Sequence, residues 1–417
     1  MHNSHLKNLE LVKYFVILSL VLFESRVLTR GEHEIALDGY SYNTTSHDVT
    51  NYGAVGDGIT DDTKAFEAAW GAACTSGLDK VAICVPSGKA FLVSRILFQG
   101  PCKPISISFQ ILGTIVAPPR SKWEAQIIAD EWLHFHLVVG LEVMGYGQGL
   151  IDGKGGSWWS YGPNVTRPTA MRFSHCNELQ VSGLTHIDSP MNHISINECS
   201  NVSLTELHMI APITSPNTDG IDISASTNIS VHDSKMETGD DCIAINGGTS
   251  HVNITGIECG PGHGISIGSL GKDGRYEEVE DITVSNCSFH RTHNGVRIKT
   301  WQGGSGFARR ITFSNINFDA TDNPVIIDQY YCPHQICTEK KSAVKVSDVK
   351  YIRLQGTSIS RDATINFSCS QTVPCADIQM DDVNIVPIDQ QPPSSQCINA
   401  HVTEHSSNPA LRCRNRQ

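Results

Sequence analysis

The sequence predicts an all-β protein, a single-stranded right-handed parallel β-helix with a short N-terminal capping helix. Three observations lead to this class. Alternating apolar pairs recur at a near-constant interval, a second pair follows in each repeat, and no long helical stretch separates them. Short strands at a period of roughly twenty to thirty residues are typical of a solenoid of stacked coils. The first pairs are Leu179/Val181, Val202/Leu204, Ile229/Val231, Val252/Ile254, Ile282/Val284, Ile311/Phe313 and Ile352/Leu354.

The second pair of each coil predicts a second strand, again with one apolar face turned inward. A leucine-rich repeat fits less well, because the anchors are Ile and Val and the helix-forming half of the repeat is missing. A β-propeller would need longer blades and antiparallel hairpins. The second pairs are Ile194/Ile196, Ile221/Ile223, Ile243/Ile245, Ile265/Ile267, Val296/Ile298 and Val325/Ile327.

The first residues have the pattern of a secretory signal. Lys7 and Lys13 precede an apolar run from Tyr14 to Phe23, which is too short to span a bilayer. We expect a signal peptide over residues 1–28, with an approximate cleavage point, and a short segment over residues 29–47. Fourteen cysteines and seven Asn-x-Ser/Thr sequons agree with export. The sequons lie at Asn43, Asn164, Asn201, Asn228, Asn253, Asn286 and Asn366.

The stretch from Asp61 to Ala73 predicts the capping helix, because Asp stands at its start and its apolar residues have helical spacing. Such a helix covers the first coil and blocks pairing at the open edge of the solenoid. Asp57, Asp61 and Asp62 are therefore interpreted as turn and cap residues rather than catalytic ones. The β-helix is expected over residues 48–389 and a disulfide-stapled tail over residues 390–417, with no second domain.

The cysteine spacings predict short staples at Cys332–Cys337, Cys369–Cys375 and Cys397–Cys413, and a link Cys242–Cys259. A bond between Cys74 and Cys102 competes with Cys84. Cys176 and Cys199 both precede a strand anchor by three residues, so they either stack as buried thiols or pair.

Composition limits the classes of function. The chain of 417 residues is 40% apolar and 18% charged, and its net charge of −12 argues against a general binder of nucleic acid or anionic membrane. A local basic patch could still bind an acidic ligand. We expect a monomer without cofactor or metal.

Three acid/base residues share one phase of the repeat. Asp219, Asp241 and His263 each stand two residues before the second apolar pair of their coil, and Asp240 adds a carboxylate. Coils of a parallel β-helix lie roughly 4.8 Å apart, so these side chains should form a column. Carboxylates this close cannot all ionise freely, so the pKa of at least one should rise. One site can then keep both a general acid and a general base.

The next coil adds two cations to this column. Val296 and Ile298 should point inward, so Arg297 and Lys299 should point outward beside the carboxylates. Paired cations beside carboxylates indicate a substrate that itself carries carboxylates. Taken singly, each residue could be an ordinary turn or solvated residue, and the same phase holds turn-forming Asn in other coils. These are Asn192, Asn294 and Asn323.

Four motifs give the chain a resemblance to the polygalacturonases, a family of pectin-hydrolysing glycoside hydrolases. They are Ser215–Gly220, Gly239–Cys242, Gly262–Gly264 and Arg297–Thr300, in the family's order and spacing. The segment Tyr52–Thr63 resembles the N-terminal motif of plant members. The resemblance extends from about residue 48 to residue 389, and no motif residue departs from the pattern.

The resemblance implies an inverting hydrolase of α-1,4-linked galacturonate. Asp240 would be the general acid, Asp219 and Asp241 would hold and activate the water, and His263 would tune the protonation of the acid. The rung spacing between Asp219 and Asp241 falls below the carboxyl separations of both inverting and retaining enzymes. Inversion is therefore implied by the resemblance and not by the spacing.

The resemblance also implies substrate contacts. Arg297 and Lys299 would bind the galacturonate carboxylate beside the scissile bond, and Asn217 would orient its loop or contact sugar. Tyr331 resembles a sugar-contacting tyrosine of the family, although Tyr330 is adjacent.

Competing functions remain open at this point: a hydrolase of another acidic pectin such as rhamnogalacturonan or xylogalacturonan, a Ca²⁺-dependent pectate lyase, and a non-catalytic pectin-binding β-helix. Endo and exo action both fit. The expected partner is polygalacturonate, and the expected location is the extracellular cell wall.

Overall fold

The computed structural model describes residues 45–123, 130–161, 165–333, 337–338, 340–360 and 362–415. The expected signal peptide over residues 1–28 and the sequons at Asn43 and Asn164 lie outside these ranges. No helix among the described residues is long and apolar enough to cross a membrane.

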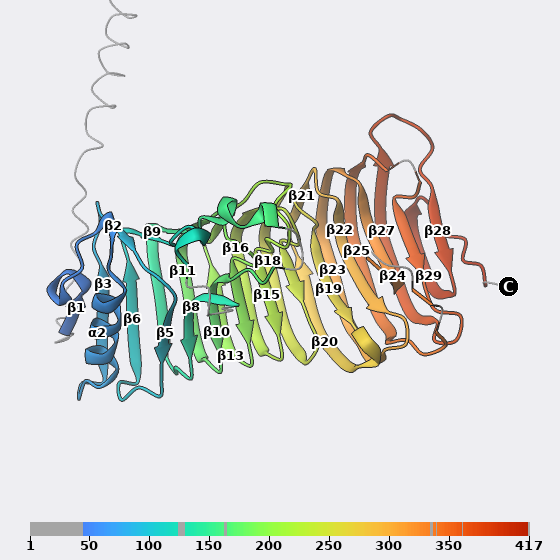
Figure 1. The fold of residues 1–417 in the computed structure, drawn as a ribbon. Coiled ribbons are helices and arrows are strands. Elements are labelled where there is room, and N and C mark those ends of the chain that lie inside the picture. Colours follow the sequence, from blue (N-terminus) through green and yellow to red (C-terminus); the bar gives the residue numbers. More distant parts are fainter. Residues whose placement is uncertain are drawn as a thin grey trace, which may run out of the picture. The chain divides into compact units, whose positions relative to one another are not determined.

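Two long sheets form the solenoid, and every strand pairing within the described ranges is parallel (Figure 1). This confirms the predicted parallel β-helix. The first sheet has eleven strands. They are β5 (Ile96–Gln99), β8 (Glu131–His136), β10 (Thr169–Ser174), β12 (Ile194–Asn197), β15 (Ile221–Ser224), β17 (Ile243–Ile245), β19 (Ile265–Leu270), β22 (Asn294–Trp301), β24 (Asn323–Tyr331), β26 (Ile365–Ser368) and β28 (Ser395–Ile398).

The second sheet has eighteen strands in the described part of the chain. They are β1 (Thr45–Asp48), β2 (Asp57–Asp61), β3 (Lys80–Val85), β4 (Ala90–Leu92), β6 (Ser106–Ile111), β7 (Thr114–Val116), β9 (Leu141–Asp152), β11 (Asn177–Ile187), β13 (Ser200–Thr205), β14 (His208–Ile210), β16 (Thr227–Glu237), β18 (Thr249–Cys259), β20 (Tyr276–Ser285), β21 (Ser288–His290), β23 (Ser305–Thr321), β25 (Lys345–Ser358), β27 (Cys375–Pro387) and β29 (Ala400–Asn408). Short 3₁₀ turns are η1 (Val49–Tyr52), η2 (Arg120–Lys122), η3 (Gly155–Ser157), η4 (Trp159–Tyr161) and η5 (Lys272–Gly274).

The predicted apolar pairs form the core. First pairs lie in the eighteen-stranded sheet and second pairs in the eleven-stranded sheet, where Ile221, Ile243 and Ile265 are Cα partners on successive rungs. Each of these three side chains is fully buried. The stack of equivalent residues fixes which side chains of different coils lie above one another.

One predicted anchor pair is displaced. Val349 and Tyr351, not Ile352 and Leu354, are the partners of the Ile311/Phe313 pair. Tyr351 is fully buried and stacks on the ring of Phe313, with ring centroids 5.3 Å apart. An aromatic residue, Tyr351, therefore fills the core position of this coil, and the search for alternating apolar pairs did not identify it.

Helix α2 (Thr63–Cys74) is the predicted capping helix, and it packs against β1, β3 and β5 (Figure 1). Its buried Trp70 meets the ring of Phe98 edge to face. Asp61 accepts the backbone N–H of Thr63, the first residue of the helix, so it stabilises the turn that leads into the helix. Asp62 instead accepts backbone N–H groups of the preceding turn, those of Val55 and Gly56.

Five disulfides occur within the described ranges. Four are the pairs that the spacings predicted, namely Cys242–Cys259, Cys332–Cys337, Cys369–Cys375 and Cys397–Cys413. The fifth, Cys74–Cys102, is the pair that the sequence left open against Cys84. Cys84 stays reduced. Cys176 and Cys199 are buried free thiols, and the Cys199 sulfur accepts the backbone N–H of Cys176 at 3.3 Å.

The two ends of the β-helix differ from the expected domain bounds. Strand β1 pairs with β3, so the sheet already includes Thr45, before the expected start at residue 48. At the other end, β28 pairs with β26 and β29 pairs with β27. The boundary expected at residue 389 is therefore too early, because the Pro/Gln/Ser-rich composition near it belongs to a turn between coils.

Candidate active site

The turns that enter β15, β17 and β19 hold the predicted column. The backbone N–H of Gly220 donates to the Asp241 carbonyl at 2.9 Å, and the N–H of Cys242 donates to the Gly264 carbonyl at 2.8 Å. These ladder bonds place the residues of equal phase on adjacent rungs. Asp219, Asp241 and His263 therefore do lie in successive coils at one position, as the repeat predicted.

Two glycines allow these turns to approach one another. A Cβ on Gly239 would lie 2.1 Å from the Ser215 carbonyl oxygen, inside any permitted contact. Gly264 has a φ of +87°, which L side chains rarely adopt, and its Cβ would meet the Gly295 carbonyl oxygen. Both positions require glycine because neighbouring backbone occupies the space.

Asp241 is the buried centre of the site, with an exposed fraction of 1%. Its Oδ1 accepts hydrogen bonds from Arg297 Nη2 at 2.7 Å and from Ser266 Oγ at 2.9 Å. Its Oδ2 accepts one from Lys299 Nζ at 2.7 Å. Burial works to raise the pKa of this carboxyl, but Lys299 and Arg297 outweigh it and lower the pKa. Asp241 is therefore held ionised.

Asp240 lies on the solvent side of Asp241, with its side chain 21% exposed. Its Oδ1 accepts the backbone N–H of Asp241 at 2.9 Å and lies 3.0 Å from His263 Nδ1. Its Oδ2 lies 3.5 Å from Asn217 Nδ2. His263 is more exposed, and its ring packs against the ring of His293. Asp240 is thus the carboxylate of the pair that solvent reaches.

Asp219 completes the carboxylate cluster. Burial raises the pKa of Asp219 well above its ordinary value, and the charges of Asp240 and Asp241 raise it further. Lys299 opposes this effect but does not cancel it. Crowding by Asp240 and Asp241 thus raises the pKa of one carboxyl of the cluster, as expected, although burial contributes most. The pKa values of Asp219 and Asp241 are shifted in opposite directions.

Asp222, on the outward face of β15, is a further carboxylate close to this cluster. Burial raises its pKa to about 6, and an Asn246 Nδ2 hydrogen bond at 3.0 Å only partly offsets burial. The neutral form of Asp222 is therefore favoured in the folded state up to moderately acidic pH.

We predict that Asp222→Asn stabilises the protein near neutral pH. A carboxyl whose folded pKa is raised binds more protons in the folded state, so its contribution is favourable in acid and is lost as pH rises through about 6. Removing the charge should raise the free energy of unfolding at about pH 7 and change it little at about pH 3. We expect a gain of only about 1–2 kcal/mol at about pH 7, because the site is only partly desolvated. Thermal unfolding at both pH values measures this. An equal gain at both would contradict the charge argument.

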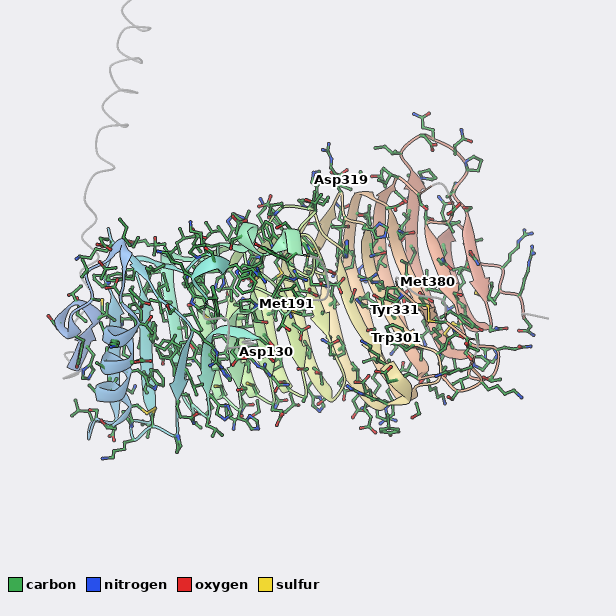
Figure 2. The ribbon with its side chains drawn as sticks, in the orientation of Figure 1. Asp130, Met191, Trp301, Asp319, Tyr331 and Met380 are labelled. Atoms are coloured by element: carbon green, nitrogen blue, oxygen red, sulfur yellow. A yellow bond between two sulfur atoms is a disulfide. The ribbon has the colours of Figure 1, made fainter. Side chains whose placement is uncertain are left out.

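Tyr331 lies beside Lys299, whose Nζ is 5.5 Å from the centre of the tyrosine ring. Figure 2 shows Tyr331 next to Trp301, and the two rings meet edge to face with centroids 5.4 Å apart. Tyr330 faces a different space, a cavity of about 340 Å³ that Lys340 also lines. Of the two adjacent tyrosines, Tyr331 is therefore the one at the carboxylate site.

Three residues of the site were not singled out from the sequence. Ser266 links Arg297 Nε, at 2.9 Å, to Asp241, and its place between Ile265 and Ile267 could have identified it. Trp301 follows the Arg297–Thr300 motif directly. Arg167 approaches from the irregular segment before β10, so no periodic signal identified it.

A divalent cation fits this cluster poorly. Asp240, Asp241 and His263 offer ligand atoms within 4.8 Å of one another. However, Arg297 and Lys299 already occupy both oxygens of Asp241, and two fixed positive charges repel a third cation.

Comparison with known proteins identifies the family. The model of glycosyl hydrolases family 28 matches residues 74–407, which is more than half of the chain. The chain belongs to this family. It is therefore a glycoside hydrolase, and the family 28 match covers all strands of the eleven-stranded sheet and every residue of the column.

Curated relatives of this family 28 hydrolase cover most of its length. A probable polygalacturonase of Arabidopsis thaliana is 48% identical over 372 residues, which are 88% of this chain and 80% of the relative. A polygalacturonase of Prunus persica is 41% identical over 365 residues, or 86% and 91% of the two chains.

Solved structures support the fold. An endo-xylogalacturonan hydrolase of Aspergillus tubingensis has a TM-score of 0.76 at 22% identity, over 89% of this chain and 99% of the other. A polygalacturonase of Erwinia carotovora has a TM-score of 0.69 at 21% identity, over 88% and 98%. At these identities the likeness concerns the β-helix and not the substrate.

Proposed function

We propose that this hydrolase is a polygalacturonase that cleaves α-1,4 bonds between galacturonate residues of pectin homogalacturonan, with inversion. The observation that carries the proposal is the cluster of Asp219, Asp240 and Asp241 against the paired cations Arg297 and Lys299. The cluster thus offers one carboxyl as general acid and others to hold the attacking water. The two cations offer a binding site for the carboxylate of an acidic sugar. The names of the curated relatives support the same activity.

In the proposed mechanism, Asp240 protonates the leaving oxygen, because its partly exposed carboxyl can reach a bound polymer. Asp241, ionised by its two cations, and Asp219 hold the attacking water. His263 Nδ1, close to Asp240 Oδ1, sets when that acid carries its proton.

Arg297 and Lys299 have two tasks in this proposal. Their contacts with Asp241 keep the base ionised, and their remaining donors face the sugar carboxylate next to the scissile bond. Tyr331, placed by Trp301 and Lys299, gives an aromatic surface for that sugar ring. Asn217 fixes the loop that carries Asp219.

We predict that the purified protein releases reducing ends from polygalacturonate, and that chelator leaves the rate unchanged. Hydrolysis without an unsaturated, UV-absorbing product excludes a pectate lyase, and NMR of the first product reads its anomeric configuration. Product sizing over time separates exo action, with monomer from the start, from endo action, with a ladder of oligomers. Binding of polygalacturonate without any release would contradict the proposal.

Another acidic pectin is the second candidate substrate, and the fold shared with a xylogalacturonan hydrolase motivates this comparison. Rates on xylogalacturonan and rhamnogalacturonan, measured beside polygalacturonate, test it. Higher kcat/KM on either would replace the main proposal.

We also propose export to the cell wall and a monomeric state. Five disulfides are typical of proteins that fold in an oxidising compartment. Detection of the protein in the extracellular fraction and its mass by light scattering test the two statements.

A further inference from the structure

Arg167 is a buried arginine that ties together separate turns around the site. Its side chain comes from the segment before β10, and the residue is only 4% exposed. Its Nη1 donates to the carbonyls of Pro190, at 2.9 Å, and of Pro216. Its Nη2 donates to Asn217 Oδ1 at 2.7 Å. One guanidinium therefore holds the turn after β11 and the turn before β15 in a fixed relation.

The second of these turns carries catalytic candidates. Asn217 has a φ of 53°, a left-handed conformation that Asn tolerates better than most residues. Its Oδ1 is held by Arg167, so its Nδ2 is directed toward Asp240 Oδ2, 3.5 Å away. A chain of contacts thus leads from Arg167 through Asn217 to the carboxyl proposed as the acid.

Arg167 is also a charge behind the carboxylates. Burial lowers the pKa of Arg167, whereas the charges of Asp240 and Asp219 act to raise it. Because electrostatic interaction is mutual, the cation favours the ionised forms of the same two carboxyls. The other charged or titratable groups near these carboxyls are Asp222, Asp241, His263, His293, Arg297 and Lys299.

Arg167 differs from Arg297 and Lys299 in the groups that it contacts. Arg297 and Lys299 contact Asp241 directly. Arg167 makes its hydrogen bonds to two carbonyls and an amide, all neutral acceptors. Its charge therefore acts on Asp219 and Asp240 without occupying their oxygens, which leaves those oxygens for water and substrate.

We propose that Arg167 is a positioning residue of the hydrolase: it orients Asp240 through Asn217, and its buried positive charge stabilises the negative charge of the carboxylate cluster. This inference rests on the proposed function, because it assigns the carboxyls of this cluster a role in hydrolysis. It adds a residue outside the four motifs.

The test compares two variants. Arg167→Gln removes both the positive charge and the guanidinium with its two donating Nη groups, whereas Arg167→Lys keeps the charge alone. For Arg167→Gln we expect kcat to fall about 10- to 100-fold with little change in KM, and the acid limb of the pH–kcat profile to move to higher pH. Arg167→Lys should lose rate but keep the wild-type acid limb. The matched control is Arg310→Gln, because Arg310 of β23 pairs with Asp281 of β20 in the other sheet. Its pH–kcat profile should be unchanged.

A double-mutant cycle with Asn217→Ala tests the route of the effect. If Arg167 acts through Asn217, the loss in kcat of Arg167→Gln/Asn217→Ala should be smaller than the combined losses of the single variants. Additive losses would overturn this route. Loss of thermal stability with wild-type kcat and pH profile would reduce Arg167 to a structural residue and overturn the proposal.

A second readout is independent of activity. Without the cation, the negative charge that the carboxylate cluster gains as pH rises is less well compensated, so the drop in Tm of Arg167→Gln should be larger at about pH 7 than at about pH 4. An equal drop at both pH values would contradict the role of the charge. If the wild type hydrolyses no pectin while this pH dependence is found, the proposed function fails and the electrostatic role of Arg167 stands.

Discussion

The Asp240→Asn variant is expected to lose about 10²- to 10⁴-fold in kcat on polygalacturonate, because general acid catalysis contributes on this order. Its fold should persist, since the Asp240 side chain is 21% exposed and makes no ion pair to Arg or Lys among the described residues. Release of reducing ends and thermal unfolding measure the two effects. The matched control is Asp319→Asn, which changes an exposed aspartate of β23 (Figure 2). Among the ion pairs of the described residues, Asp319 contacts only His290, at 2.6 Å, so this variant should keep full activity.

A substrate with an activated aryl leaving group separates the acid from the base. Such a leaving group needs no proton, so Asp240→Asn should cleave it at a rate near that of the wild type. Asp219→Asn should stay slow on both substrates, because it lacks a group that holds the water. The reverse pattern would assign the acid to Asp219, whose pKa the site raises. Full activity of Asp240→Asn on polygalacturonate would contradict the mechanism as a whole.

Lys299→Met is expected to destabilise the protein by about 3 kcal/mol and to abolish measurable hydrolysis. The variant leaves the fully buried Asp241 carboxylate with Arg297 and Ser266 alone, and breaking a buried ion pair costs roughly 3–5 kcal/mol when one partner stays charged. Because Arg297 still pairs with Asp241, we expect a loss of stability at the lower end of this range. Denaturant unfolding gives the change in free energy.

A double variant, Lys299→Met with Asp241→Asn, identifies the cause of this destabilisation. Removing the uncompensated charge should restore at least half of the lost stability, while the enzyme stays inactive without its ionised Asp241. Lys350→Met is the control, since the Lys350 side chain is 41% exposed and its Nζ lies 3.9 Å from Asp348. This variant should change stability by less than about 0.5 kcal/mol. A double variant less stable than Lys299→Met would contradict the argument.

Much of this molecule follows from periodicity. Apolar pairs predicted the two sheets, and equal phase placed Asp219, Asp241 and His263 on adjacent rungs, because a parallel solenoid stacks residues of equal phase. Four of the five disulfides in the described ranges followed from their spacings, whereas the choice of Cys102 over Cys84 as the partner of Cys74 needed the structure. The exceptions are the anchor pair at Val349 and Tyr351 and the two ends of the solenoid, where turn lengths and an aromatic core residue break the pattern.

The partners of the side chains needed the tertiary structure. Alternation predicted that Arg297 and Lys299 face the column, but not that both bind Asp241. Arg167 was not identified at all, since it reaches the site from an irregular segment. The sequence by itself determined which residues share a rung, because β-strand alternation and coil stacking repeat regularly. Which charges meet was decided only by the tertiary structure, because turn paths and side-chain conformations between distant coils follow no repeat.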